Sequence, residues 1–182
     1  MAVLFADIRG STTLGEHVGP AKYAALLNRF YGAATESLIR QDAIIDKLIG
    51  DEVMALFIPG ICGPNFRRRA ADAALLLLEA VGYGAASDPW MPIGVGVNAG
   101  LTYVGNVGSE GVVDFTALGD TVNTASRLAA SAASGEIVLS EEVYEALAEV
   151  HPEADRRSLI LRGKETPFMA RVVTAQPKIS TS

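Results

Sequence analysis

Cysteine and net positive charge are both scarce in this sequence, and each shortage excludes a class of protein. Cys62 is the single cysteine among 182 residues, so neither an intramolecular disulfide nor a cysteine-rich zinc site can form. The formal net charge is −6 at pH 7, which argues against general binding to nucleic acid or acidic membranes, because such polyanions require clustered Lys and Arg. Any phosphate site must therefore be local.

Long apolar runs are also missing. The most apolar stretch, Ala70 to Ala86, contains Asp72 and Glu79 and is too short and interrupted to span a bilayer. Residues 1–5 have no basic segment and lead directly to Asp7, so we interpret them as a strand rather than a signal peptide. We expect a cytoplasmic domain that makes no membrane contact itself. Because the chain begins almost directly with a predicted strand, the domain could belong to a longer protein.

The composition is that of a packed globule. Hydrophobic residues make up 49% of the chain and charged residues 20%, and no low-complexity tract suggests disorder. The length is usual for one domain. We therefore expect one domain over residues 1–175 and a flexible tail over residues 176–182.

Apolar periodicity predicts strands that alternate with helices. Strands are expected at 3–6, 44–48, 53–58, 92–101, 102–107, 112–116, 137–139, 158–161 and 168–173. Helices are expected after a loop at 8–12 and at 20–40, 67–81, 121–133 and 141–149, with a loop at 59–64 and Asp120 as an N-cap. Because hairpins intervene and no linker divides the chain, the pattern favours an α/β (α+β) fold with a mixed sheet flanked by helices.

Two aspartates stand at the ends of predicted strands. Asp7 follows a buried strand, and Asp51 lies in the turn of a predicted hairpin. Taken singly, Asp7 could equally cap a helix, and Asp51 could be present because turns favour Gly-Asp. As a pair on adjacent strands they suit Mg²⁺, which is usually held by one or two carboxylates while substrate phosphates complete its shell.

The loop after Asp7 leads into a helix start, where free backbone amides and the helix dipole favour a phosphate. Gly10, Ser11 and Thr12 are the candidate phosphate-binding residues. The Gly-Lys-Ser signature of a Walker loop is absent, so this is a different kind of phosphate site.

Three segments together resemble a known family. Residues 5–12 (FADIRGST), 47–51 (KLIGD) and 119–127 (GDTVNTASR) look like the signature blocks of class III nucleotidyl cyclase catalytic domains, in that family's order. The resemblance continues to the segment Leu161 to Lys164 and thus covers nearly the whole chain.

The resemblance implies a ferredoxin-like palm with a mixed, mostly antiparallel sheet, and active sites that form between the two subunits of a homodimer. It implies that Asp7, Ile8 and Asp51 hold two Mg²⁺ or Mn²⁺ ions per site. One ion would promote loss of the ribose 3′-hydroxyl proton and the other would organise the triphosphate. The oxygen would then attack the α-phosphorus and release pyrophosphate.

Asn123 and Arg127 are four residues apart on a predicted helix, so both can project from one face. Without further context they would be an ordinary polar helix face. In the family the Asn orients the ribose and the Arg stabilises charge on the reacting phosphate, a task suited to a cation that does not lose its proton.

Lys47 and Thr116 occupy the base-reading positions of the family and resemble its Lys/Thr subgroup, which includes bicarbonate-responsive cyclases. A lysine donates to the unprotonated ring nitrogen of adenine, and a threonine hydroxyl can accept from its exocyclic amino group. Guanine would leave polar groups mismatched. Alternatively, Lys47 is an exposed hairpin lysine and Thr116 a strand former.

Two further positions concern the triphosphate. Arg162, with Lys164 as the second choice, aligns with a family residue that contacts it. Another family arginine would fall near Gly94, where this chain has none, which leaves either a weaker grip or a substitute role for Arg9.

The sequence therefore predicts an adenylyl cyclase that converts ATP to 3′,5′-cyclic AMP and pyrophosphate in intracellular signalling. The alternatives are a guanylyl cyclase and a catalytically silent regulatory module with the same fold. A diguanylate cyclase is disfavoured because its Gly-Gly-acidic hairpin is missing and because the Asn123/Arg127 helix would go unexplained.

Overall fold

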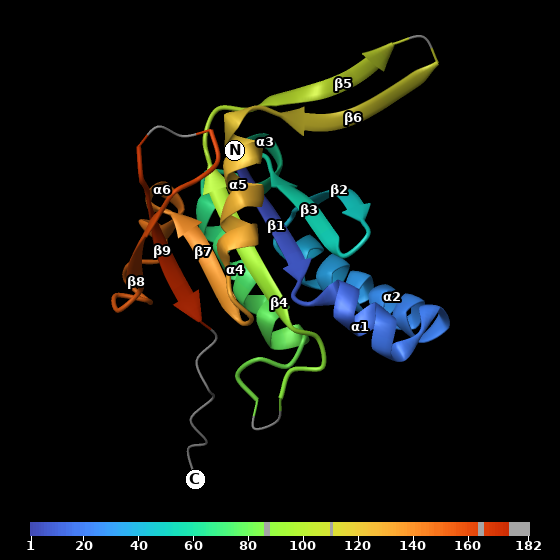
Figure 1. The fold of residues 1–182 in the computed structure, drawn as a ribbon. Helices are drawn as coiled ribbons and strands as arrows, with labels where there is room; N and C mark the ends of the chain where they lie inside the picture. Colours follow the sequence, from blue (N-terminus) through green and yellow to red (C-terminus); the bar gives the residue numbers. More distant parts are fainter. Residues whose placement is uncertain (86–87, 110, 164–165, 175–182) are drawn as a thin grey trace.

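A mixed sheet forms the centre of the molecule (Figure 1). The computed structural model describes residues 1–85, 88–109, 111–163 and 166–174, so the predicted tail at 176–182 lies outside the described residues. The seven-stranded sheet has the order β2-β3-β1-β4-β7-β9-β8. Its strands are β1 (Ala2–Ile8), β2 (Ile44–Ile49), β3 (Glu52–Phe57), β4 (Ile93–Ala99), β7 (Glu136–Ser140), β8 (Asp155–Leu159) and β9 (Phe168–Thr174).

The strand pairing confirms the predicted mixed, mostly antiparallel sheet. β1 pairs antiparallel with both β3 and β4, and the outer pairs β2–β3, β7–β9 and β8–β9 are antiparallel as well. Only the β4–β7 pair is parallel among the pairings of the described residues. The connection between β4 and β7 is long enough for the crossover that a parallel pair requires.

Helices cover both faces of the sheet, as the sequence predicts (Figure 1). They are α1 (Ser11–Val18), α2 (Pro20–Ile39), α3 (Pro59–Cys62), α4 (Phe66–Ala80), α5 (Asp120–Ser131) and α6 (Glu141–Tyr144). Leu4 of β1 packs in the core beneath α2 and α4, whereas Val3 and Phe5 pack toward α5. β1 is apolar throughout its first residues because neither of its faces meets water.

α5 lies unusually close to the sheet. A Cβ atom placed on Gly96 of β4 would come within 2.1 Å of the Ala129 backbone nitrogen, so only glycine permits this approach. Asn98 donates to the Thr121 carbonyl at 3.0 Å, and the Thr121 hydroxyl donates to the Leu101 carbonyl at 2.7 Å. These contacts fix the position of α5 over β1 and β4.

The strands β5 (Tyr103–Ser109) and β6 (Val112–Leu118) form a separate hairpin that projects from the body (Figure 1). Large apolar side chains on it are exposed: Tyr103 by 57%, Val113 by 59% and Phe115 by 57%. The rest of the described chain leaves this apolar surface uncovered.

Several predicted boundaries were wrong. The expected loop at 59–64 contains the short helix α3, because Pro59 suits a first helical position and Gly63, with φ 75°, ends the turn. β1 continues through Asp7 to Ile8, and β8 begins at Asp155 rather than near Ser158.

Two helix predictions also need correction. The helix expected at 141–149 ends at Tyr144, after which Leu147 N bonds to the Tyr144 carbonyl at 2.7 Å in a tighter turn. Asp120 is the first residue of α5 and Gly119 is its N-cap. Among the described residues, no helix has the length and apolar character needed to cross a membrane.

Candidate active site

The strand pairing brings the two predicted metal-binding aspartates together. Asp7 stands opposite Glu52 of β3 and Gly94 of β4. Asp51 occupies the turn just before β3, and its carbonyl accepts a hydrogen bond from the Ile8 backbone N–H at 3.1 Å. The residues Asp7, Ile8 and Asp51 are therefore neighbours at one end of the central strands.

Helix α2 holds the turn that contains Gly50 and Asp51 in place. Gly50 adopts a left-handed conformation, with φ 58°, which glycine enters without strain. The Tyr31 hydroxyl of α2 donates to the Gly50 carbonyl. Burial raises the pKa of Tyr31, and Tyr23 and the Asp51 carboxylate add to that rise. Tyr31 therefore remains a protonated donor at neutral pH.

Negative charge accumulates at this end of the sheet. Burial raises the pKa of Asp7; the Arg9 guanidinium opposes the rise, and the Asp51 carboxylate adds to it. Burial likewise raises the pKa of Glu52, with Asp7 and Asp51 contributing further. Partly desolvated carboxylates that repel one another form an environment that a cation would stabilise.

Arg9 is the protein's own cation at this position. Its Nη2 lies 2.5 Å from Asp7 Oδ2, its Nε donates to the Asp7 carbonyl at 3.3 Å and its Nη1 to the Ala130 carbonyl at 3.4 Å. A Cβ on Gly94 would come within 3.2 Å of Arg9 Nε and 2.9 Å of Ala132 Cβ. Arg9 and the end of α5 thus fill the space that a side chain at position 94 would need.

The donor set fits a magnesium or manganese ion. Carboxylate oxygens of Asp7 and Asp51 are hard ligands, and both lie in a cluster whose charge is only partly compensated. Within the part of the chain that the structure describes, no group of three or more His, Cys, Asp or Glu side chains has the arrangement to hold a metal. An ion bound here would therefore depend on further oxygens, such as the Ile8 carbonyl and substrate phosphates.

The predicted phosphate loop leads directly into α1. Gly10 is the N-cap in a left-handed conformation with φ 68°, and Ser11 begins the helix. The Gly10 carbonyl accepts from Leu14 N at 2.9 Å. Ser11 is half-buried and Thr12 exposed, and the amides of the first turn of a helix have no partner within the helix and can bind an anion.

Asn123 and Arg127 occupy successive turns of α5, with Asn123 exposed and Arg127 half-buried. The turn at Gly163 lies beside Arg127, since a Cβ there would sit 3.7 Å from Arg127 Nη2. Arg162 is exposed in this turn. The structure therefore brings Arg127 close to the segment of Arg162, while Lys164 lies outside the described residues.

The two predicted base-reading residues meet between β2 and the β5–β6 hairpin. The Thr116 hydroxyl donates to Asp46 Oδ2 at 2.8 Å, and the Lys47 ammonium pairs with the Asp114 carboxylate. The hydrogen bond that Lys47 donates to Asp114 raises the pKa of Lys47. Lys47 Nζ also lies 3.9 Å from Asp46 Oδ2, so Asp46 is close to both base-reading candidates within one chain.

Sequence reasoning missed Asp46 and Asp114 and left Arg9 as one of two alternatives. Asp46 adjoins Lys47, and Asp114 lies two residues before Thr116 on the same face of a strand. Those spacings could have suggested that Asp46 and Asp114 lie near the base-reading residues. Their partners could not be predicted, because β2 contacts the β5–β6 hairpin only in the folded chain. Among the described residues, surface hollows also lie away from this site, one lined mainly by residues 150–155 with part of β9, and another at the end of α2 and on α4.

The chain belongs to the family described as the adenylate and guanylate cyclase catalytic domain, which it matches over residues 1–172. The palm fold and the resemblance to class III cyclases are thereby confirmed. The chain is similar to the crystal structure of the adenylyl cyclase CyaB from P. aeruginosa, with a TM-score of 0.79 and 27% identity over 98% of this chain and 95% of that one.

This chain matches one part of curated relatives that are longer proteins. An uncharacterized protein of Mycobacterium tuberculosis is 34% identical over 178 residues, which is 95% of this chain and 32% of the relative. An adenylate cyclase of Anabaena cylindrica is 33% identical over 137 residues, or 70% of this chain and 26% of the relative. The chain thus spans about a third or less of the length of these relatives.

Proposed function

We propose that this cyclase domain converts ATP to 3′,5′-cyclic AMP and pyrophosphate at sites shared between two copies of the chain. The choice of ATP is supported by two contacts between β2 and β6. Lys47 of β2 pairs with Asp114 of β6, and Thr116 of β6 donates to Asp46 of β2. That arrangement holds a cationic donor and a hydroxyl side by side, as adenine recognition requires.

The base is read by complementary hydrogen bonds. The Lys47 ammonium is protonated, and its raised pKa keeps it so at neutral pH. It donates to an unprotonated ring nitrogen of adenine, while the Thr116 oxygen accepts from the exocyclic amino group. Guanine presents a ring N–H and a carbonyl at those places, and mismatched polar groups lower its kcat/KM.

The reacting groups are handled by Asp7, Asp51 and the helix α5. Asp7 and Asp51, with the Ile8 carbonyl, hold the divalent ions, which supply Lewis acidity toward the 3′-hydroxyl and the phosphates when bound. Gly10, Ser11 and Thr12 offer the amides and hydroxyls of the first turn of α1 to the triphosphate.

Asn123 orients the ribose, and Arg127 stabilises the charge that builds on the α-phosphate. A guanidinium is suited to this because it remains charged and offers several donors in a fixed plane. Arg162 lies in the turn beside Arg127 and extends the positive charge toward the terminal phosphates. Lys164 follows in the same segment as the second candidate.

The proposed homodimer supplies each site with metal ligands from one chain and with Lys47, Thr116, Asn123 and Arg127 from the other. One feature of the structure supports it. The β5–β6 arm exposes Tyr103, Val113 and Phe115, an apolar surface suited to a second copy. Cyclic symmetry then makes two equivalent sites in each dimer.

The direct test is to incubate the purified chain with ATP or GTP, with Mg²⁺ or Mn²⁺, and to quantify the cyclic products over a range of protein concentrations. We expect cyclic AMP to dominate and specific activity to fall on dilution as dimers dissociate. Equal or greater turnover of GTP would overturn the assignment of ATP. Product from neither nucleotide would favour a silent regulatory module.

A further inference from the structure

Asp46 is a buried carboxylate that the proposed reaction does not use directly. Its side chain is only 2% exposed, although it lies on β2 beside the surface residue Lys47. It accepts the hydroxyl hydrogen of Thr116 at 2.8 Å, and Lys47 Nζ lies 3.9 Å from its Oδ2. Burying a carboxylate is costly unless it is paired, so the two partners explain how Asp46 is tolerated there.

The hydrogen bond between Thr116 and Asp46 has a fixed direction. An ionised carboxylate can only accept, and a threonine hydroxyl has one hydrogen to donate. Thr116 is itself 5% exposed, so few other orientations of its hydroxyl find a partner. With its hydrogen committed to Asp46, the Thr116 oxygen can offer only lone pairs to a ligand.

We propose that Asp46 is a specificity-positioning residue: by taking the Thr116 hydroxyl hydrogen, it makes Thr116 an acceptor only, suited to a purine with an amino group at position 6. This inference rests on the proposed function. A 6-amino group finds an acceptor at Thr116, whereas a 6-oxo group meets an oxygen that cannot donate to it. Selection between the two classes of purine thus comes from a residue that does not touch the base.

The test compares ATP with inosine triphosphate, which carries a 6-oxo group and a ring N–H but lacks the 2-amino group of GTP. The change is Asp46→Asn, which preserves volume but can either accept from Thr116 or donate to it. The wild-type chain should favour ATP over inosine triphosphate in kcat/KM. In the variant that preference should fall about tenfold, because Thr116 becomes free to donate.

The fall should have two contributions. The KM for ATP should rise and the KM for inosine triphosphate should drop, while kcat for ATP changes little, since Asp46 is remote from the phosphates in the proposed site. A purely structural defect would lower both activities in parallel. A Thr116→Val background supplies a second check, because Asp46→Asn should not alter the preference once the hydroxyl is gone.

Asp72→Asn is a matched control, since Asp72 pairs with Arg68 on α4 at 2.8 Å and should leave the preference unchanged. An unaltered preference in a folded Asp46→Asn chain, with cyclic AMP still produced, would overturn this inference and leave the proposed function standing. If Asp46→Asn does not fold, the wild-type chain still decides, because equal use of ATP and inosine triphosphate would contradict an acceptor-only Thr116.

Failure of the proposed function has a different signature, which is no cyclic product from any nucleotide with the wild-type chain. The inference would then be tested by equilibrium binding of ATP and inosine triphosphate. The ratio of their dissociation constants should narrow about tenfold in Asp46→Asn. A ratio that stays the same would overturn it.

Discussion

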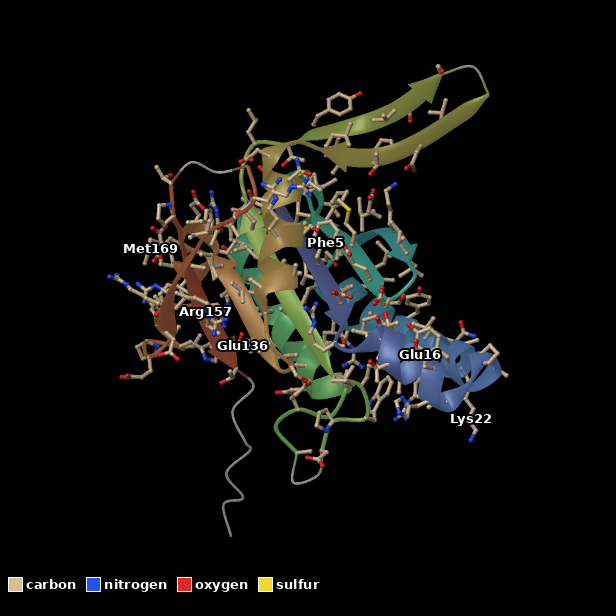
Figure 2. The ribbon with its side chains drawn as sticks, viewed as in Figure 1. Phe5, Glu16, Lys22, Glu136, Arg157 and Met169 are labelled. Carbon is tan, nitrogen blue, oxygen red and sulfur yellow. The ribbon has the colours of Figure 1, made fainter. Side chains whose placement is uncertain are left out.

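Two regions of the sheet, one on β1 and β3 and the other on β7, shift the pKa values of their carboxylates in opposite directions. Near β1 and β3, burial raises the pKa values of Asp7 and Glu52 and neighbouring carboxylates raise them further, with Arg9 as the compensating cation. On β7, hydrogen bonds from Arg157 lower the pKa of Glu136. Figure 2 shows Glu136 and Arg157 side by side, and both guanidinium contacts measure 2.7 Å.

We interpret this difference as one between residues that stabilise the fold and residues that are proposed to serve a ligand. Glu136 has its charge matched within the chain, and so does Glu141, which pairs with Arg171 at 3.0 Å. The cluster of Asp7, Asp51 and Glu52 is left short of positive charge. Uncompensated charge is unfavourable for folding and is retained where a cation or substrate completes it.

The largest expected effect comes from Asp51→Ala. Cyclic AMP production should fall at least about a hundredfold, because a catalytic ion supplies several kcal/mol and each 1.4 kcal/mol is about tenfold in rate. The free energy of unfolding should stay the same or rise, since a repelling carboxylate is removed. Product assay and urea titration measure the two quantities. Loss of stability without loss of activity would place Asp51 with Glu136 instead.

Arg127→Ala should come next, with a decrease in kcat of about a hundredfold, the usual cost of removing one group that stabilises transition-state charge. The substitution leaves the core contacts of α5 intact, because Arg127 is only half-buried. Arg127→Lys should recover a small part of the rate, since an ammonium lacks the planar set of donors. Full activity in Arg127→Ala would remove this residue from the site.

Glu136→Gln should lower stability and leave activity unchanged, which is the reverse of the effects expected for Asp51→Ala. The free energy of unfolding should decrease by about 1 kcal/mol, because the ion pair at this partly exposed position becomes a hydrogen bond from the Arg157 cation to an uncharged amide. The kcat should stay at the wild-type value. The exposed Glu149→Gln is the matched control and should change neither quantity. A change in kcat with Glu136→Gln would break the contrast between the β1–β3 region and the β7 region.

The smallest effect is a pH dependence. The pKa of Glu136 is lowered in the folded chain, so its contribution to stability is present above the unfolded carboxyl pKa of about 4.3 and is lost as pH falls through the folded value. The difference in unfolding free energy between wild type and Glu136→Gln should therefore shrink below about pH 4. Urea titrations at several pH values measure it, and a difference that grows on acidification would contradict the assignment.

Much of the architecture could be predicted from sequence because its signals are local. The helix of α2 shows its apolar stripe from Tyr23 to Leu38, and the hairpin around Gly50 shows two strand-like runs. The predictions failed where contacts with residues further along the chain decide where a helix or strand ends. α6 stops at Tyr144 although the sequence could continue it, and the Tyr144 hydroxyl bonds to the His151 carbonyl at 2.9 Å in the turn that follows.

The candidate site shows the same contrast between local signals, which the sequence reveals, and distant contacts, which it does not. Motif spacing was sufficient to nominate Asp7, Asp51, Asn123 and Arg127. The partners of these and other site residues could not be predicted, because they come from distant parts of the chain. Arg9 reaches Ala130 on α5, and Asp46 reaches Thr116 on β6.

The most direct test of a shared active site is to mix inactive Asp51→Ala chains with inactive Arg127→Ala chains. Each mixed dimer would contain one site with both substitutions and one intact site. Random exchange of equal amounts should therefore restore about a quarter of the wild-type activity. Exchange is verified independently by copurification of differently tagged chains. Recovery near that level is the expected result, and no recovery despite proven exchange would contradict catalysis at sites shared between two chains.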